Sequence, residues 1–283
     1  MIQSMTGYGK SVIQLDTKKI TLEVKSLNSK NLDINTRFPG VYREKEMEVR
    51  RLIARELVRG KVDMTFYIES TTTETSTKIN TGIVANYIEQ LETIRKEADI
   101  LSIAMRLPDV LKTEREELDE EEWGVIEAGI AESIVALQAY RSSEGEELKR
   151  DFENRIETLK GKLEVVMDLD SERLEQVRTR LMKSISELKQ TVDENRFEQE
   201  LIYYLEKLDI TEEKVRLNNH LSYFVQELNS DDSNGKKLGF ISQEIGREIN
   251  TIGSKANFAP MQKTVVEMKD ELEKIKEQLL NVL

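Results

Sequence analysis

The sequence contains no cysteine, three prolines and one histidine among its 283 residues. Without cysteine there are no disulfide bonds, no thiolate zinc site and no cysteine nucleophile, and this composition suits a cytoplasmic protein. No run of about 18 apolar residues occurs, so we expect no transmembrane span and no membrane partner. The N-terminus lacks a basic segment followed by an apolar one, so we expect no signal peptide.

Several catalytic signatures are missing as well. The sequence has no G-x-G-x-x-G, H-E-x-x-H or G-x-S-x-G motif, which argues against nucleotide-dependent and serine-hydrolase chemistry. The N-terminal segment M-I-Q-S-M-T-G-Y-G is compatible with a strand whose glycines approach a phosphate. It lacks the G-K-S/T ending of a P-loop, however, so it indicates no nucleotide site by itself.

Charge is abundant and unevenly distributed. The formal net charge of −12 argues against a nucleic-acid partner, because binding phosphates usually requires a cationic surface. Residues 1–62 nevertheless hold 13 Lys and Arg against 7 Asp and Glu, a balance of +6 that leaves −18 for the rest. This asymmetry is typical of an end that faces a polyanion or another subunit, and it is equally compatible with random unevenness.

The hydrophobic pattern predicts an α+β protein: a small N-terminal sheet covered by a helix, then long helical hairpins and a helical C-terminal region. Apolar residues alternate at Ile20, Leu22 and Val24, which is the period of a strand. We therefore expect three parts, which are a basic α/β domain (1–75), a long helical arm region (76–195) and a helical C-terminal region (196–283).

Breaks in the pattern predict where these parts are subdivided. The polar segment at 71–77 is the expected linker, because it has no apolar periodicity. Helical periodicity continues from about 122 to 195, with Asp168 to Ser171 as the expected turn of a hairpin. Near the C-terminus, a helix from about 236 to 252 is expected to end at Gly253.

A polar arc follows that helix, within the segment Q-E-I-G-R-E-I-N-T-I-G-S-K-A (243–256). At about 100° per residue, one arc of about 100° contains Glu244, Arg247, Glu248, Thr251 and Lys255. Glu244 and Glu248 point the same way, so they can share a divalent cation or divide acid and base roles. Ordinary Glu–Arg and Glu–Lys pairing on a solvated face is the simpler interpretation, and periodicity alone favours it.

The only histidine, His220, lies on the preceding predicted helix, on one face with Glu213 and Glu227. Histidine transfers protons near neutral pH and binds metals, although a lone histidine on a helix is more often structural. The polar loop at 229–235 predicts antiparallel packing of the two helices. Such packing can bring His220 opposite Glu244 and Glu248.

The chain resembles the YicC/YloC family from end to end. The resemblance is carried by six stretches, which are M-I-Q-S-M-T-G-Y-G, E-V-K-S-L-N-S-K-N-L-D, R-G-K-V-D, Y-R-S-S-E-G-E-E-L, D-I-T-E-E-K-V-R-L-N-N-H-L-S-Y-F and G-K-K-L-G-F-I-S-Q-E-I-G-R-E-I-N-T-I-G-S-K-A. Several blocks in the right order argue against coincidence. Gly246 stands where the family pattern has asparagine, and Ser29-Lys30 where it has a His-Arg pair, which weakens an RNA role for that loop.

The resemblance implies a bacterial cytoplasmic endoribonuclease that depends on a divalent metal, Mn²⁺ or Mg²⁺, and forms a homohexamer. Its substrates would be single-stranded or structured RNA, including small regulatory RNA. Carried over by position, the residues for catalysis and metal binding are His220, Glu244 and Glu248 in the C-terminal region. The RNA-binding candidates are Arg216, Arg247, Asn250, Lys255, Lys237, Arg59 and Lys61. The alternative is a non-catalytic RNA-binding or oligomeric scaffold protein, and without the resemblance a coiled-coil assembly protein would rank first.

Overall fold

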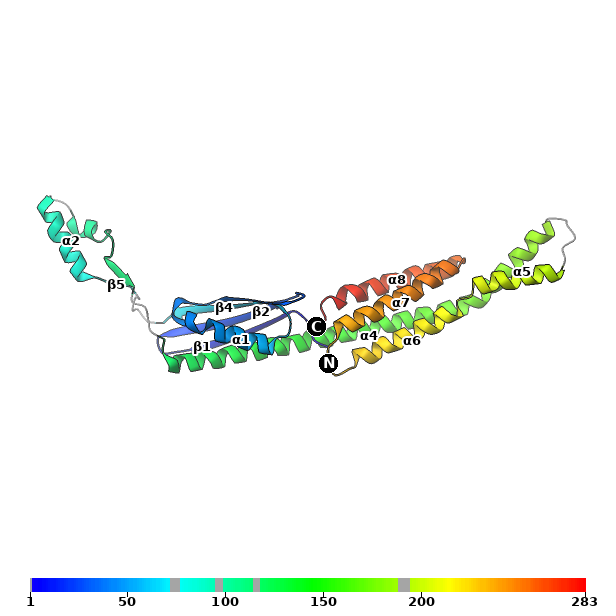
Figure 1. The fold of residues 1–283 in the computed structure, drawn as a ribbon, viewed down its shortest axis with the longest axis horizontal. Coiled ribbons are helices and arrows are strands. Elements are labelled where there is room, and N and C mark those ends of the chain that lie inside the picture. Colours follow the sequence, from blue (N-terminus) through cyan, green and yellow to red (C-terminus); the bar gives the residue numbers. More distant parts are fainter. Residues whose placement is uncertain (1, 72–76, 95–98, 114–117, 188–193) are drawn as a thin grey trace.

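The computed structural model describes residues 2–71, 77–94, 99–113, 118–187 and 194–283, and it has the expected α+β architecture (Figure 1). The expected linker at 71–77 lies largely outside the described residues. The elements are, in chain order, β1 (Gly7–Gln14), β2 (Lys18–Leu27), β3 (Leu32–Arg37), a 3₁₀ helix (Gly40–Lys45), α1 (Glu46–Glu56), β4 (Gly60–Ser70), β5 (Thr77–Ile79), α2 (Thr81–Ile94), α3 (Ile100–Ala104), β6 (Leu111–Thr113), α4 (Glu120–Glu187), α5 (Glu194–Lys207), α6 (Thr211–Leu228), α7 (Gly235–Lys255) and α8 (Ala259–Leu279).

The N-terminal sheet has the strand order β1-β2-β4-β3. β2 pairs antiparallel with β1 and β4, and β3 pairs parallel with β4. The alternating residues Ile20, Leu22 and Val24 are fully buried, and they pack in one cluster with apolar side chains of α1 and of the first half of α4. The predicted sheet and its covering helix are therefore confirmed, and α4 adds a second cover that the pattern did not reveal.

Two glycines of β1 explain how closely α4 approaches the sheet. A Cβ atom at Gly9 would lie 1.9 Å from the carbonyl oxygen of Ser133 on α4, and one at Gly7 would lie 3.0 Å from Leu137 Cγ. Only glycine leaves room for the helix at these positions. The glycines of T-G-Y-G begin the strand and face α4, so the interpretation of this segment as a phosphate approach is wrong.

Helix α4 runs without interruption through both halves of the molecule. Its first half covers the sheet, and its second half contributes Phe152, Ile156 and Leu163 to the core of a helical bundle (Figure 1). The turn predicted at 168–171 does not exist, because α4 continues to Glu187. Asp170 lies inside the helix and forms ion pairs of 2.7 Å with Arg173 and with Lys214 of α6. A polar stretch that looked like a loop is thus a contact between helices.

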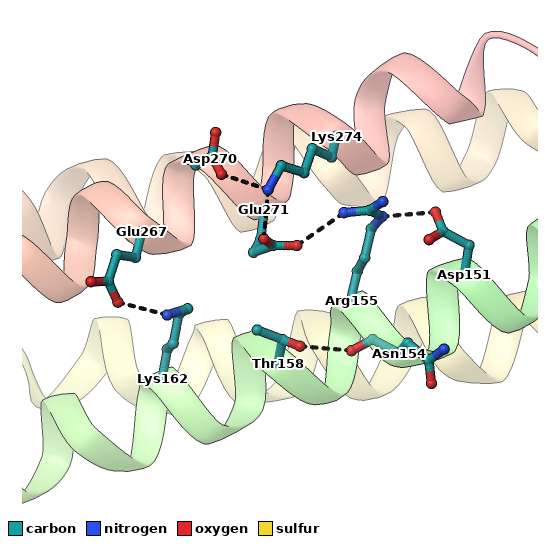
Figure 2. Close-up of polar contacts among 9 residues, drawn as sticks. All are labelled: Asp151, Asn154, Arg155, Thr158, Lys162, Glu267, Asp270, Glu271 and Lys274. Carbon is teal, nitrogen blue, oxygen red and sulfur yellow. Dashed lines mark hydrogen bonds and ion pairs between the residues drawn. The ribbon is translucent and has the colours of Figure 1, made fainter.

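The C-terminal bundle consists of the second half of α4 with α6, α7 and α8, which share one apolar core. Figure 2 shows the ion pairs that join α4 to α8: Arg155 Nη1 lies 3.0 Å from Glu271 Oε2, and Lys162 Nζ lies 2.7 Å from Glu267 Oε2. These pairs are partly exposed, so they align the two antiparallel helices more than they stabilise them. No helix within the described residues is long and apolar enough to cross a membrane.

Glycine also permits the close packing of α7 on α8. The helix does not end at Gly253, as the sequence predicted, but continues to Lys255. A Cβ atom at Gly253 would lie 3.0 Å from Val265 Cγ1 of α8. This glycine therefore serves as a contact point between helices, and the helix ends one turn before Phe258, the residue that precedes α8.

The two ends of the chain meet where the sheet adjoins the bundle (Figure 1). The backbone N–H of Met5 donates to the carbonyl of Asn281 at 2.8 Å, and the N–H of Leu283 donates to the carbonyl of Gln3 at 3.0 Å. These bonds tie the N-terminal segment to the end of the bundle. We call this contact of residues 3–5 with residues 281–283 the junction, and it holds the two halves of the molecule together.

The stretch Y-R-S-S-E-G-E-E-L (140–148) is part of α4 and contacts the N-terminal segment at the junction. The buried Arg141 Nη2 donates to the carbonyl oxygens of Met5 and Arg59, each at 3.2 Å. Burial lowers the pKa of the Arg141 guanidinium. A Cβ atom at Gly145 would lie 2.2 Å from the carbonyl oxygen of Ile2, so the N-terminal segment can lie on α4 only where a side chain is absent.

A smaller unit, formed by β5, α2, α3 and β6, has its own cluster around Val84, Ala104 and Val110. β5 and β6 pair antiparallel as a two-stranded sheet. The domain boundaries expected at 75/76 and 195/196 stay predictions.

Candidate functional site

The C-terminal helices α6 and α7 pack as an antiparallel hairpin that is held at both ends by ion pairs. Lys255 Nζ lies 2.8 Å from Glu213 Oε1, and Lys237 Nζ lies 2.6 Å from Glu227 Oε2. The predicted antiparallel packing is confirmed. We call the facing stripes the α6–α7 seam, which consists of Glu213, His220 and Glu227 on α6 and of Lys237, Glu244, Glu248 and Lys255 on α7.

The two ion pairs fix the register of the hairpin. His220 lies seven residues from both Glu213 and Glu227, and position 246 lies nine residues from both Lys237 and Lys255. His220 is therefore level with the point midway between Glu244 and Glu248. A step of seven residues returns to the same face of a helix within about 20°, so the histidine lies on the same stripe as its two neighbouring glutamates.

Burial and pairing separate the members of the seam. The exposed fractions of Glu213, Glu227 and Glu248 are 5%, 9% and 8%, while His220 is half-buried. Glu213 and Glu227 each have a lysine partner. Within the described part of the chain, neither Glu248 nor His220 has a hydrogen-bond or ion-pair partner. Among the described residues, the enclosed side-chain oxygen that lacks a partner is Glu213 Oε2 and not an oxygen of Glu248. The carboxylate of Glu248 is therefore open to water, and equally to a bound cation or proton donor.

Glu244 differs from Glu248 although the two lie one turn apart. Its Oε1 atom is 2.7 Å from Arg247 Nη1, and its side chain is 39% exposed. The Arg247 side chain is itself 71% exposed, so this pair lies at the surface of α7. Asn250 is exposed further along the same helix. The predicted polar arc therefore contains one paired carboxylate and one unpaired carboxylate.

The remaining cations of the seam are held by the protein itself. Lys255 Nζ donates to the carbonyl of Asp209 at 2.8 Å as well as to Glu213. Hydrogen bonding to Glu227 raises the pKa of Lys237, which favours its charged form. Of the predicted RNA-binding residues on α6, Arg216 is exposed and forms an ion pair with Glu212.

Arg59 and Lys61, the other two predicted RNA-binding residues, lie away from the seam. Lys61 is exposed on β4, where it pairs in register with Leu27 of β2. Arg59 precedes that strand at the junction, and its Nε donates to the carbonyl of Ser29 at 3.1 Å. The structure thus distributes the seam residues along the α6–α7 hairpin and puts these two cations at the start of β4.

The departure at Gly246 does not affect the seam. A Cβ atom at this position would lie 3.2 Å from Leu272 Cδ2 and 3.7 Å from Lys276 Nζ, both on α8. An asparagine here would therefore point at α8 and away from His220.

The seam residues have the donor chemistry that a divalent cation prefers, namely carboxylate oxygen and imidazole nitrogen. Within the described residues, however, no group of three or more His, Asp or Glu side chains is placed to hold a metal ion. Glu248 and His220 would supply two ligands at most from one chain. Mg²⁺ usually binds one or two carboxylates together with substrate phosphates and water, so such a partial set is compatible with a site that the substrate completes.

Sequence reasoning selected His220, Glu244 and Glu248, whose roles stay predictions, and it left two other features out. The role of Glu213 and Glu227 in fixing the register was visible only as their seven-residue spacing from His220. For the loop of Lys30 the sequence predicted a weakened RNA role, and it gave no sign that this loop adjoins the start of α7. That proximity depends on the junction between residues more than 200 positions apart.

Comparison with known proteins agrees with this architecture. Two family models match: "Endoribonuclease YicC-like, N-terminal region" over residues 2–150, and "Endoribonuclease YicC-like, C-terminal" over residues 166–283. The chain therefore belongs to the YicC-like endoribonuclease family.

Two relatives align with the chain over the full length of both proteins. A protein of Clostridioides difficile (strain 630) named "Probable endoribonuclease YicC" is 35% identical over 292 aligned residues. A protein of Haemophilus influenzae with the same name is 27% identical over 287. The similarity thus includes the sheet, the junction and the seam.

Proposed function

We propose that the chain is an endoribonuclease and that the α6–α7 seam is its catalytic site. The observation that carries this proposal is the position of the unpartnered, buried Glu248 at the level of the only histidine. Both lie between two ion pairs that hold the helices in register. Family membership and the names of the relatives support RNA as the substrate.

Cleavage of a phosphodiester requires a positioned nucleophile, stabilisation of charge on the phosphate and a proton for the leaving oxygen. His220 is suited to hold or transfer that proton near neutral pH. Glu248 is suited to accept a proton or to orient a cation. Arg247 and Arg216 lie exposed beside the seam, where they can neutralise the phosphate.

We further propose that the reaction depends on Mn²⁺ or Mg²⁺, held by Glu248 and His220 with Glu244 next to them. A divalent cation would supply charge stabilisation on the phosphate and a more acidic water. The support lies in the donor chemistry and in the missing partners of Glu248 and His220.

Three more specific proposals about substrate, assembly and location rest on the family resemblance alone. They are that small regulatory RNAs are among the substrates, that the protein forms a homohexamer and that it acts in the cytoplasm. Other subunits of such an assembly are a further source of ligands for the cation.

The decisive experiment incubates purified protein with labelled RNA in the presence of EDTA, Mn²⁺ or Mg²⁺. We expect cleavage that EDTA stops and that added metal restores, and a loss of cleavage in His220→Ala with an unchanged circular-dichroism spectrum and assembly state. Cleavage that resists EDTA and survives in His220→Ala would overturn the seam as the active site. Salt-sensitive RNA binding without any product would instead favour the scaffold alternative.

A further inference from the structure

A cleft of about 490 Å³ lies at the junction, on the side of α7 that faces away from the seam. Three separate parts of the chain contribute to it: the loop after β2 together with Arg59, the first turns of α7 and the last turns of α8. Its cations are Lys30, Arg59, Lys236 and Lys276.

The cleft is cationic in a protein whose net charge is −12. None of its lining residues is an aspartate or a glutamate. Lys276 pairs with Glu273 at 2.7 Å, but Lys30, Arg59 and Lys236 have no carboxylate partner among the described residues. Part of the wall is apolar, formed by residues such as Met5. Clefts that combine charges of one sign with low-dielectric walls concentrate the electrostatic field and attract counter-ions.

The walls of the cleft are held in place before any ligand binds. Asn28 Nδ2 donates to the carbonyl of Leu280 at 2.6 Å, which joins the loop after β2 to the end of α8. Arg59 is fixed by its bond to the carbonyl of Ser29, and its own carbonyl accepts from the buried Arg141. Fixing the loop and Arg59 in advance reduces the conformational entropy that binding would otherwise cost.

The exposed face of α7 connects the cleft to the seam. From Lys236 to Glu248 the helix rises by about 18 Å. Between them Phe240 is 56% exposed, Gln243 lies at the rim of the cleft, and Arg247 is exposed beside the seam. An exposed aromatic ring flanked by cations is the arrangement with which proteins bind single-stranded nucleic acid, by base stacking and phosphate contacts.

We propose that the cleft binds internal backbone phosphates of the RNA strand outside the cleaved position, through Lys30, Arg59 and Lys236. The strand then crosses the exposed face of α7 from the cleft to the seam. This inference rests on the proposed function for its substrate but concerns binding, whereas the seam concerns cleavage. Because the contacts are to phosphates, the cleft holds RNA without regard to base sequence.

The test measures binding of a 5′-hydroxyl single-stranded RNA oligonucleotide by fluorescence anisotropy at a series of salt concentrations, in the presence of EDTA. We expect Lys30→Ala/Lys236→Ala to weaken binding on the order of tenfold and to reduce the slope of log K against log salt by about 1.4, or about 0.7 for each lost phosphate contact. The matched control is Lys263→Ala/Lys269→Ala, which removes the same charge from exposed positions of α8 outside the cleft. The control is expected to keep the affinity and slope of the unmodified protein.

Unchanged affinity and slope in Lys30→Ala/Lys236→Ala, or an equal loss in the control, would overturn the proposal. So would a loss seen only with a 5′-phosphorylated oligonucleotide, because the cleft would then bind a terminal phosphate. Glu248→Gln separates the two proposals: it is expected to bind RNA at least as well as the unmodified protein. If it also cleaves RNA normally, the seam assignment fails while the cleft assignment stands.

Discussion

The charged side chains on the two sides of α7 differ in sign and in whether they have partners. Along the seam, Lys237 and Lys255 are each paired with a buried glutamate of α6, and the unpaired groups are Glu248 and His220. On the other side, the cleft holds cations and no carboxylate. Paired charges fix the register of the helices, whereas unpaired charges are available to a ligand. In the two proposals, α7 accordingly has one reactive face, along the seam, and one binding face, along the cleft.

The largest expected effect separates the two neighbouring carboxylates of the seam. Glu248→Gln removes the unpartnered carboxylate at the level of His220, so we expect kcat for RNA cleavage to fall by about 10² to 10⁴. Glu244 is already paired with Arg247 at the surface, so Glu244→Gln should have a clearly smaller effect. Single-turnover cleavage at saturating metal compares them. Equal losses would show that the pairing of Glu244 does not matter.

The next variant tests whether RNA binding in the cleft can be impaired without an equal loss of cleavage at the seam. Gly145→Ala places a Cβ atom 2.2 Å from the carbonyl of Ile2 and should push the N-terminal segment off α4. We expect a loss of about 1–3 kcal/mol in the free energy of unfolding, measured in urea. Because the junction builds the cleft and not the seam, RNA affinity should fall more than the single-turnover rate. A rate that falls while affinity is kept would contradict this separation.

Within the seam, the ion pair at one end is expected to matter for stability. Lys255→Met leaves Glu213 buried, with its Oε2 atom already lacking a partner, and should cost about 3 kcal/mol. The variant Lys255→Met/Glu213→Gln removes the uncompensated charge and should recover much of the loss in urea unfolding. Lys237→Met is the comparison at the other end, where a more exposed lysine predicts a smaller effect.

The smallest expected effect concerns Asp209, just before α6. Its Oδ1 atom accepts a hydrogen bond of 2.7 Å from Thr211 Oγ1, which lowers the pKa of the Asp209 carboxyl. A lowered pKa in the folded state means that this contribution to stability is present at neutral pH and is lost as the pH falls through the folded-state value. Asp209→Asn should therefore cost about 1 kcal/mol or less at pH 7. Urea unfolding at a series of pH values below 7 should show the difference shrinking as the Asp209 carboxyl becomes protonated.

The sequence was a good guide wherever one face of an element is apolar. Strand alternation at Ile20, Leu22 and Val24 predicted β2, and helical periodicity predicted α6 and α7. It failed at Asp170 and Gly253, where a polar residue and a glycine looked like breaks. Both serve contacts between helices, with Lys214 and Val265, and such contacts leave no local pattern.

For the candidate site, too, the sequence predicted helix faces but not side-chain contacts. Helical spacing placed Glu244 and Glu248 on one arc, and it showed only that antiparallel packing can bring His220 opposite them. It could not show that Glu244 is paired with Arg247 while Glu248 is buried without a partner, because that depends on burial and on side-chain conformation. The sequence pattern could not predict the cleft, because Lys30 and Lys236 come together only through the contacts at the junction.

One consequence of α4 extends beyond a single chain. A helix of 68 residues without proline is about 100 Å long, and it is embedded in the core of the sheet at one end and of the bundle further along. Because it is one continuous helix, it can act as a lever between the two halves. A tilt of about 5° at the sheet would move the far end by about 9 Å at that length. In an assembly of several copies, a contact made at one end of this lever would therefore set the spacing at the other.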